Sequence, residues 1–300
     1  MKKLVSLLLA LTVALCGLPA LAESSEITVT DMMGRTVTLS GPATRVVGLT
    51  ASNIEILYAI GAGDLVVGRG TYCTYPEEAL AVTDVQSGAE TNVEEIIALQ
   101  PDLVIMDAMA QTEEQVNALE AAGIPVVMTQ ESGLQGVYDA ITLIGAVTGC
   151  DEAAAALVTE MTEGFAAVQA AAADFSGMTV YLEVSGPEWG DPWIAGSGTM
   201  MDELIGLCGL TNAFADVSGW GTVSVETILE RDPDLMILTD GYTDVDSVTA
   251  REGWDSLSCV RNGLIFKPTE DIQIPGPRLL AVAQELLAFL QQYAAEVPAA

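Results

Sequence analysis

The sequence contains no histidine, and its basic residues are few: 10 lysines and arginines stand against 42 aspartates and glutamates in 300 residues. Without imidazole, the chain lacks the usual general base, the usual Ser or Cys triad and most zinc ligand sets. G-x-S-x-G, Walker A and complete dinucleotide-binding motifs are missing as well. These absences argue against an enzyme, although the many carboxylates leave an exported glycosidase open.

The scarcity of positive charge also limits the partners. A formal net charge of -32 repels nucleic acid and anionic lipid, so neither is expected to bind. Half of the residues are apolar, which permits sizeable cores, and the length is sufficient for two domains.

Only the N-terminus carries a long apolar run. Lys2 and Lys3 precede a mainly apolar run over residues 4–15, and Ala20-Leu21-Ala22 has the small-x-small pattern of a cleavage site. The stretch predicts a secretory signal over residues 1–22, and therefore an exported, periplasmic or cell-surface protein. A lipid anchor at Cys16 is the alternative to soluble export. No other run approaches the roughly 20 residues that cross a bilayer.

Four cysteines follow the signal: Cys73, Cys150, Cys208 and Cys259. No C-x-x-C motif is present, so neither a zinc site nor a redox motif is expected. In an exported protein Cys208 and Cys259, both in the second half of the chain, are one candidate disulfide. Buried, unpaired thiols are the other interpretation.

A stretch of the sequence occurs twice. Residues 92–105 recur as residues 224–237 at a constant offset of 132, with Val, Glu, Ile and the whole of Pro-Asp-Leu retained. Each copy predicts a helix with Asn92 or Ser224 as N-cap, then a turn and a buried strand. Self-similarity at this spacing indicates that two similar units were joined in one polypeptide.

Strands alternating with helices predict two parallel α/β lobes, one over residues 27–150 and one over residues 177–293. Between them, residues 151–173 are rich in alanine and carry apolar side chains at helical spacing. They predict a single helix of about 34 Å, which is long enough to join the lobes rigidly. The expected fold class is therefore α/β, with two Rossmann-like lobes, parallel sheets, one long connecting helix and a ligand cleft between the lobes.

Several large aromatic residues follow predicted strands, at the edge where parallel sheets bind ligands. These aromatics either pack loops onto the core or line the cleft. Glu94 and Glu226 start helices at the same edge, one in each lobe. They either complement the helix dipoles or form a matched pair that docks onto arginines of a partner. The aromatic candidates are Tyr72, Tyr75, Trp189, Trp193, Trp220, Tyr242 and Trp254.

These features resemble the helical-backbone class of extracytoplasmic substrate-binding proteins of ABC importers, which serve cobalamin, ferric siderophores and haem. The resemblance covers essentially all of residues 27–293. Its most specific motifs are Tyr72-x-x-Tyr75-Pro76, Asn92-Val93-Glu94, Pro101-Asp102-Leu103, Val223-Ser224-x-Glu226 and Gly276-Pro277-Arg278-Leu279. It implies that Glu94 and Glu226 contact arginines on the two halves of the membrane permease.

Among these proteins, the chain is most similar to the cobalamin-binding members. That similarity implies that Tyr72, Trp193 and Trp220 contact a corrinoid, while two further tryptophans are replaced here by Gly88 and Asp107. The expectation is thus a monomeric, non-enzymatic corrinoid receptor without a metal site or a resident cofactor. A siderophore receptor would draw on Arg69 and Arg251, and a haem receptor on a tyrosine ligand. These two receptors remain alternatives, as do the exported hydrolase and a surface adhesion module.

Overall fold

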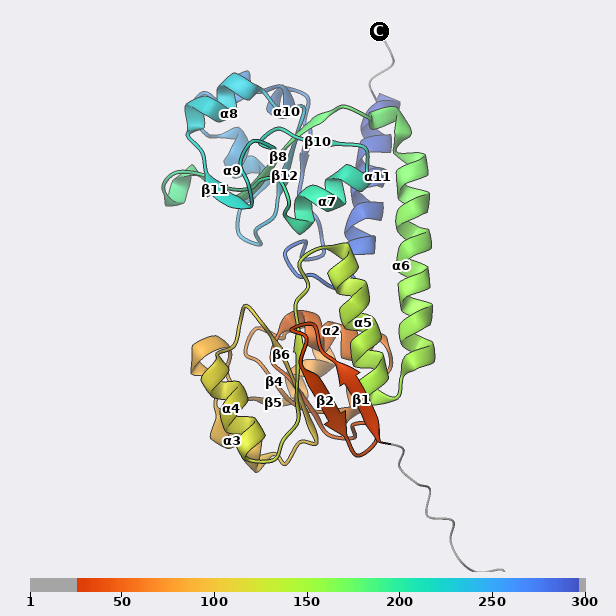
Figure 1. Cartoon of the computed structure of the whole chain (residues 1–300). Coiled ribbons are helices and arrows are strands. Elements are labelled where there is room, and N and C mark those ends of the chain that lie inside the picture. The colour runs from red at the N-terminus through yellow and green to blue at the C-terminus, as the bar shows by residue number, and fades with distance from the viewer. Residues whose placement is uncertain (1–25, 297–300) are drawn as a thin grey trace, which may run out of the picture.

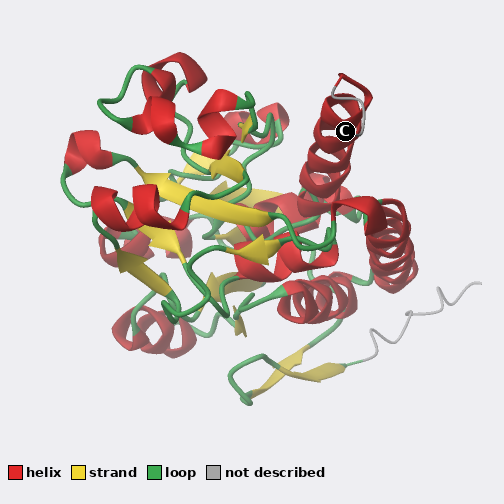
Figure 2. Cartoon of the chain, turned by 90° about the horizontal axis from the view of Figure 1, so that it is seen from above, coloured by secondary structure: helices red, strands yellow, loops and turns green. Residues whose placement is uncertain are grey.

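The computed structural model describes residues 26–296, so the predicted signal and Cys16 lie outside the described residues. Two α/β lobes are stacked end to end, and one helix, α6 (Asp151–Ala171), runs alongside both of them (Figure 1). Seen from above, helices surround the central strands, and the N-terminal two-stranded hairpin projects beyond them (Figure 2). No helix within residues 26–296 is long and apolar enough to cross a membrane.

The N-terminal lobe begins with a hairpin, an antiparallel pair of β1 (Ile27–Thr30) and β2 (Thr36–Leu39). Its main sheet is parallel, in the order β5-β4-β3-β6-β7. The strands are β3 (Val46–Gly48), β4 (Val66–Arg69), β5 (Thr83–Asp84), β6 (Leu103–Asp107) and β7 (Val126–Thr129). The helices are α2 (Ala51–Ala59), η1 (Gly63–Leu65), η2 (Glu77–Ala81), η3 (Gly88–Glu90), α3 (Val93–Ala98), α4 (Glu113–Ala121) and α5 (Leu134–Thr148).

The C-terminal lobe contains parallel strands in the order β10-β8-β12-β13, and β9 and β11 extend the sheet in antiparallel fashion. These two antiparallel strands depart from the purely parallel sheets that the sequence predicted. The strands are β8 (Thr179–Ser185), β9 (Trp193–Ala195), β10 (Thr211–Asn212), β11 (Trp220–Thr222), β12 (Leu235–Leu238) and β13 (Ile265–Phe266). The helices are η4 (Ala173–Phe175), η5 (Pro187–Trp189), α7 (Met200–Leu207), α8 (Val225–Arg231), α9 (Val245–Thr249), η6 (Trp254–Ser256), α10 (Ser258–Arg261) and α11 (Leu279–Glu296).

The sequence repeat corresponds to α3 and β6 in one lobe and to α8 and β12 in the other. Both predicted N-caps form: the Asn92 side chain accepts from Glu95 N at 3.1 Å, and Ser224 Oγ accepts from Thr227 N at 3.2 Å. The parallel strands also occur in the same order, since β4-β3-β6-β7 matches β10-β8-β12-β13. The duplication therefore extends from the local motif to the topology of the sheet.

The repeated Pro-Asp-Leu has a structural role that the sequence pattern did not indicate. Asp102 Oδ2 accepts hydrogen bonds from Thr44 N at 2.9 Å and Thr44 Oγ1 at 2.6 Å. Asp234 Oδ2 does the same for Thr179 N and Oγ1, both at 2.8 Å. In each lobe this aspartate fixes the start of the first parallel strand, which explains why it occurs in both copies.

Small residues allow α6 to pack closely against both lobes. A Cβ atom at Gly145 of α5 would lie 2.4 Å from the Ala154 Cβ, and one at Gly164 would lie 2.5 Å from Leu280 Cδ2 of α11. Gly164 thus marks the contact with α11 and does not weaken the helix into a hinge. The helix has 21 residues, two fewer than the sequence indicated.

The four described cysteines are free thiols, so the proposed pairing of Cys208 with Cys259 is wrong. Both side chains are buried in the apolar core of the second lobe. Burial raises the pKa of the Cys208 thiol to about 11 and that of Cys259 to about 12. These two thiols act as small apolar side chains, the alternative interpretation of the sequence.

Candidate ligand site

The carboxyl edges of the two sheets face each other across the interlobe contact. Arg278, just before α11, pairs with Glu55 of α2, with 2.9 Å between Nε and Oε2 and a second, shorter contact. On the other side, Glu203 of α7 accepts from Leu134 N, the first residue of α5, at 2.9 Å. Because α2 and α5 begin where parallel strands end, these contacts place the carboxyl edges of both sheets at the interface, and this is the edge where parallel α/β sheets bind ligands.

The contact at Arg278 is a network. Arg278 also pairs with Glu270 at 2.7 Å, and its guanidinium lies 4.1 Å from the centroid of the Tyr75 ring. Burial raises the pKa of Glu55 even though Arg278 opposes the shift. A pocket of about 610 Å³ lies beside this network, and Tyr75, Tyr58 and Glu160 of α6 are among its lining residues. Tyr75 is therefore placed where the lobes and α6 meet.

Six of the seven predicted aromatics are exposed at this edge, with exposed fractions from 40% to 90%. Trp193 and Trp220 lie on the paired strands β9 and β11. Their register sets Trp220 opposite Ala195, two residues from Trp193, so the two indoles project from the same face of the ribbon. The six exposed residues, here called the aromatic edge, are Tyr72, Tyr75, Trp189, Trp193, Trp220 and Tyr242.

Trp254 is the seventh, and its prediction as a ligand contact is wrong. Its side chain is only 1% exposed and packs in the core with its ring centroid 6.3 Å from that of Tyr181. The guanidinium of Arg251 covers the ring at 4.4 Å. No surface is left for a ligand, because an aromatic residue in a short turn can point inward as readily as outward.

Arg251 also holds the turn that carries Trp189. It donates to Glu183 at 2.8 and 2.9 Å and to Glu188 at 2.7 and 3.1 Å. Burial lowers the pKa of Arg251, but the two carboxylates outweigh this effect and raise it. Arg69 is similarly engaged, since it donates to the backbone carbonyls of Ala79, Gly70 and Thr71 at 3.0 to 3.3 Å. Both arginines that were considered for an anionic ligand therefore already form hydrogen bonds or ion pairs with other groups of the protein.

Two groups at the same edge were missed by the sequence. Met109 follows β6 and is 85% exposed, and Glu131 follows β7. Burial, followed by the charge of the neighbouring Asp107, raises the pKa of Glu131 from 4.5 to about 8. Neither residue belongs to a periodic or aromatic pattern, so no sequence signal identified them.

Four polar atoms at this end of the N-terminal lobe are buried without a hydrogen-bond partner among the described residues. They are Ser52 Oγ, Asn53 Nδ2, Gln111 Nε2 and Glu131 Oε1. Thr129 Oγ1 donates to Asn53 Oδ1 at 3.1 Å, so these groups adjoin the carboxyl end of β7. Buried polar atoms are normally paired, so water or polar groups of a ligand are the expected partners here.

Comparison with known proteins identifies the family. The model of the periplasmic binding protein family matches residues 46–271. The chain is 32% identical over 296 residues, 93% of each sequence, to the uncharacterized ABC transporter substrate-binding lipoprotein YvrC of Bacillus subtilis (strain 168). The chain belongs to the periplasmic binding protein family. This confirms the predicted resemblance to helical-backbone substrate-binding proteins of ABC importers and the predicted two-lobed α/β fold.

Other similar proteins within this family differ in ligand. The cobalamin-binding protein of Halobacterium salinarum (strain ATCC 29341 / DSM 671 / R1) is 31% identical over 274 residues, 86% of this chain and 72% of that protein. The periplasmic heme-binding protein RhuT of Roseiflexus sp. RS-1 superposes with a TM-score of 0.73 at 25% identity, over 84% of this chain and 99% of that one. Family membership thus identifies a transport-associated binding protein. It does not identify the ligand, for which the residues of the site are the remaining evidence.

The helices that carry Glu94 and Glu226 occupy equivalent places in this periplasmic binding protein. Both residues are exposed in the first turn, of α3 and α8 respectively. In Figure 1 both helices lie on the side of the lobes away from α6. The pKa of Glu226 is lowered by hydrogen bonds from its own backbone N–H and from Ser224, so this carboxylate is charged.

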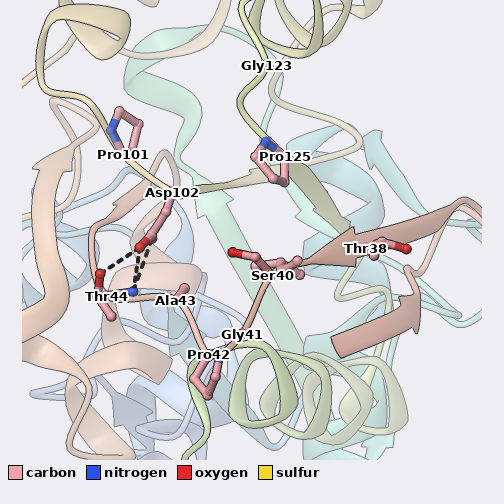
Figure 3. Close-up of a pocket in the computed structure, with 11 residues that line it drawn as sticks. Thr38, Ser40, Gly41, Pro42, Ala43, Thr44, Pro101, Asp102, Gly123 and Pro125 are labelled. Carbon is pink, nitrogen blue, oxygen red and sulfur yellow. Dashed lines mark hydrogen bonds between the residues drawn. The ribbon is translucent and has the colours of Figure 1, made fainter. Parts of the chain in front are cut away.

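A second pocket, of about 650 Å³, lies at the opposite edge of the N-terminal sheet (Figure 3). Its lining consists mainly of small residues and prolines from the segments that precede β3, β6 and β7. Asp102 is its only charged lining residue, and the hydrogen bonds from Thr44 already engage that carboxylate. This pocket adjoins the Asp102–Thr44 contact that fixes the start of β3, and it is not a candidate ligand site.

No cluster of three or more His, Cys, Asp or Glu suited to a metal occurs within residues 26–296.

Proposed function

We propose that this protein captures a corrinoid, a cobalamin-like cofactor, at the aromatic edge and delivers it to an ABC permease after export. The observation that carries the proposal is the set of six exposed aromatic side chains on the facing carboxyl edges of the two lobes. Exposed aromatics on this scale are costly in water unless they contact a ligand or partner, and a broad macrocycle covers several at once.

The corrinoid fits this site better than the alternatives. A ferric catecholate siderophore is highly anionic and needs arginines, but Arg69 and Arg251 are engaged within the protein. Haem iron commonly takes a histidine, which the chain lacks, although Tyr72 offers an exposed phenol. A relative at 31% identity is a cobalamin-binding protein, which supports the same choice.

Titration of residues 23–300 with cobalamin, cobinamide, a hydroxamate siderophore and haem tests the ligand. We expect sub-micromolar binding of a corrinoid with quenching of tryptophan fluorescence. Trp193→Ala should weaken that binding, while Met33→Ala, an exposed apolar residue on the β1–β2 turn, should leave it unchanged. Tighter binding of haem or of the siderophore would favour a haem receptor or a siderophore receptor, respectively. If none of the four compounds binds, the proposal of a cofactor receptor is refuted.

We further propose that Glu94 and Glu226 dock onto arginines of the permease. Their equivalent, exposed positions in the two lobes support a partner that is itself built of two similar halves. Reversing both residues to lysine should abolish uptake while leaving ligand affinity intact. The matched control reverses Glu152 and Glu163 of α6, which makes the same change in net charge on another surface. Loss of ligand binding in the first variant would contradict a docking role.

A further inference from the structure

Every cation among the described residues is engaged within the protein. Of the 10 lysines and arginines, Lys2 and Lys3 lie in the predicted signal, and the other eight lie within residues 26–296. Seven of these form ion pairs with carboxylates, and Arg45 donates instead to the carbonyls of Leu99 and Gln100. The paired residues are Arg35, Arg69, Arg231, Arg251, Arg261, Lys267 and Arg278.

The cations that approach the aromatic edge are the most firmly held. Arg251 forms ion pairs with two carboxylates, and its side chain is 6% exposed. Arg278 lies between Glu55 and Glu270. Freeing either guanidinium for a ligand would leave a buried carboxylate without its partner, an arrangement that is strongly unfavourable.

Carboxylates at the same edge lack such partners. Asp107 ends β6, Asp191 lies exposed between Trp189 and Trp193, and Asp240 follows β12. None of the three takes part in an ion pair within the described residues. Asp107 accepts a hydrogen bond from Met109 N, and Asp240 accepts one from Tyr242 N, both at 2.8 Å. These hydrogen bonds orient the two carboxylates but do not neutralise their negative charge.

The proton retained by Glu131 is consistent with this uncompensated charge. Its pKa is raised first by burial and then by the charge of Asp107, and the groups that oppose this shift are the neutral Thr129 hydroxyl and a backbone N–H. A positive group on a ligand would supply the missing countercharge and would also be attracted to the faces of the exposed aromatics. An anionic group would meet carboxylates with no cation free to pair with it.

From this charge balance, and resting on the proposed function, we infer that the site selects a corrinoid without an anionic nucleotide arm. Cobinamide belongs to this class, because its amino alcohol is joined through an amide bond and ends in an uncharged hydroxyl. Cobalamin carries a phosphodiester in that arm. The corrin ring and its amides are common to both, so the discrimination lies in the charge of the arm.

The test compares the two compounds in excess cyanide, where both cobalt ions carry two cyanides and no protein side chain coordinates the metal. We expect dicyanocobinamide to bind about tenfold tighter than dicyanocobalamin at low salt. This is the effect of one charge about 10 Å from a carboxylate at an effective dielectric constant of about 20. The ratio should shrink as salt is added, because screening weakens charge repulsion but not a steric clash.

Two variants locate the charge effect. Asp191→Asn should reduce the ratio several-fold, whereas Glu163→Gln, on the exposed face of α6, should leave it unchanged. Equal affinities, tighter binding of the cobalamin, or a ratio insensitive to salt would overturn the charge selection while leaving the corrinoid function standing. Binding of neither compound would instead refute the proposed function, and this inference with it.

Discussion

Replacement of Glu131 by glutamine should change how the stability of the protein depends on pH. The Glu131 carboxyl is hydrogen-bonded to Asp107, and burial together with that neighbour raises its pKa from 4.5 to about 8. Between these two pH values the folded protein holds a proton that the unfolded chain has released. Raising the pH through this window therefore favours unfolding.

The size of the effect follows from the width of the window. One pKa unit corresponds to about 1.4 kcal/mol, so the wild type should lose on the order of 3 to 5 kcal/mol of unfolding free energy between pH 4.5 and pH 8 from this group. Glutamine does not ionise, and its amide is able to donate to Asp107 as the protonated acid does. The loss should therefore disappear in Glu131→Gln.

Urea unfolding at pH 5, 7 and 9 measures this difference directly. The unfolding free energy of Glu131→Gln minus that of the wild type should rise with pH and be largest at pH 9. Glu163→Gln on α6 is the control for removing a carboxyl at an exposed site. A difference that is the same at all three pH values would refute the reasoning, because it would show that Glu131 ionises alike in both states.

Three further substitutions have separable effects. Arg278→Met leaves Glu55 buried without its partner and should cost about 3 kcal/mol in urea unfolding, with Glu55→Gln restoring part of it; no recovery would contradict the pairing. Trp254→Ala should cost about 3 to 5 kcal/mol in thermal unfolding, and an unchanged Tm would contradict its burial. Trp193→Ala should keep the wild-type Tm yet weaken corrinoid binding in calorimetry at least tenfold, an expectation that unaltered affinity would refute.

Features set by neighbouring residues were predictable from the sequence. The capped helix and buried strand of each repeat, and the long alanine-rich helix α6, arise from local capping and periodicity. Strands β9 and β11 were missed because each has only three residues, too few to show an alternating pattern. They form by pairing with each other across more than twenty residues of chain.

The residues that complete the site depend on contacts between distant segments. Arg278 and Glu55 are 223 positions apart, and Leu134 and Glu203 are 69 apart. Nothing near any of them in the sequence indicates its partner. The burial of Trp254 is decided in the same way, because Tyr181 and Arg251 cover it only after the lobe has folded.

The contacts of Glu55 and Glu203 have a consequence for symmetry. Both carboxylates lie in the first long helix of their unit, at the same distance before a glycine, and each meets the start of the last helix of the other unit. Two reciprocal contacts of this kind are the arrangement of an isologous dimer, here fused into one chain. The halves have since diverged, because one contact is an ion pair and the other is a helix cap. A pseudo-twofold axis thus passes between the lobes, and the ligand meets two related but chemically unequal surfaces.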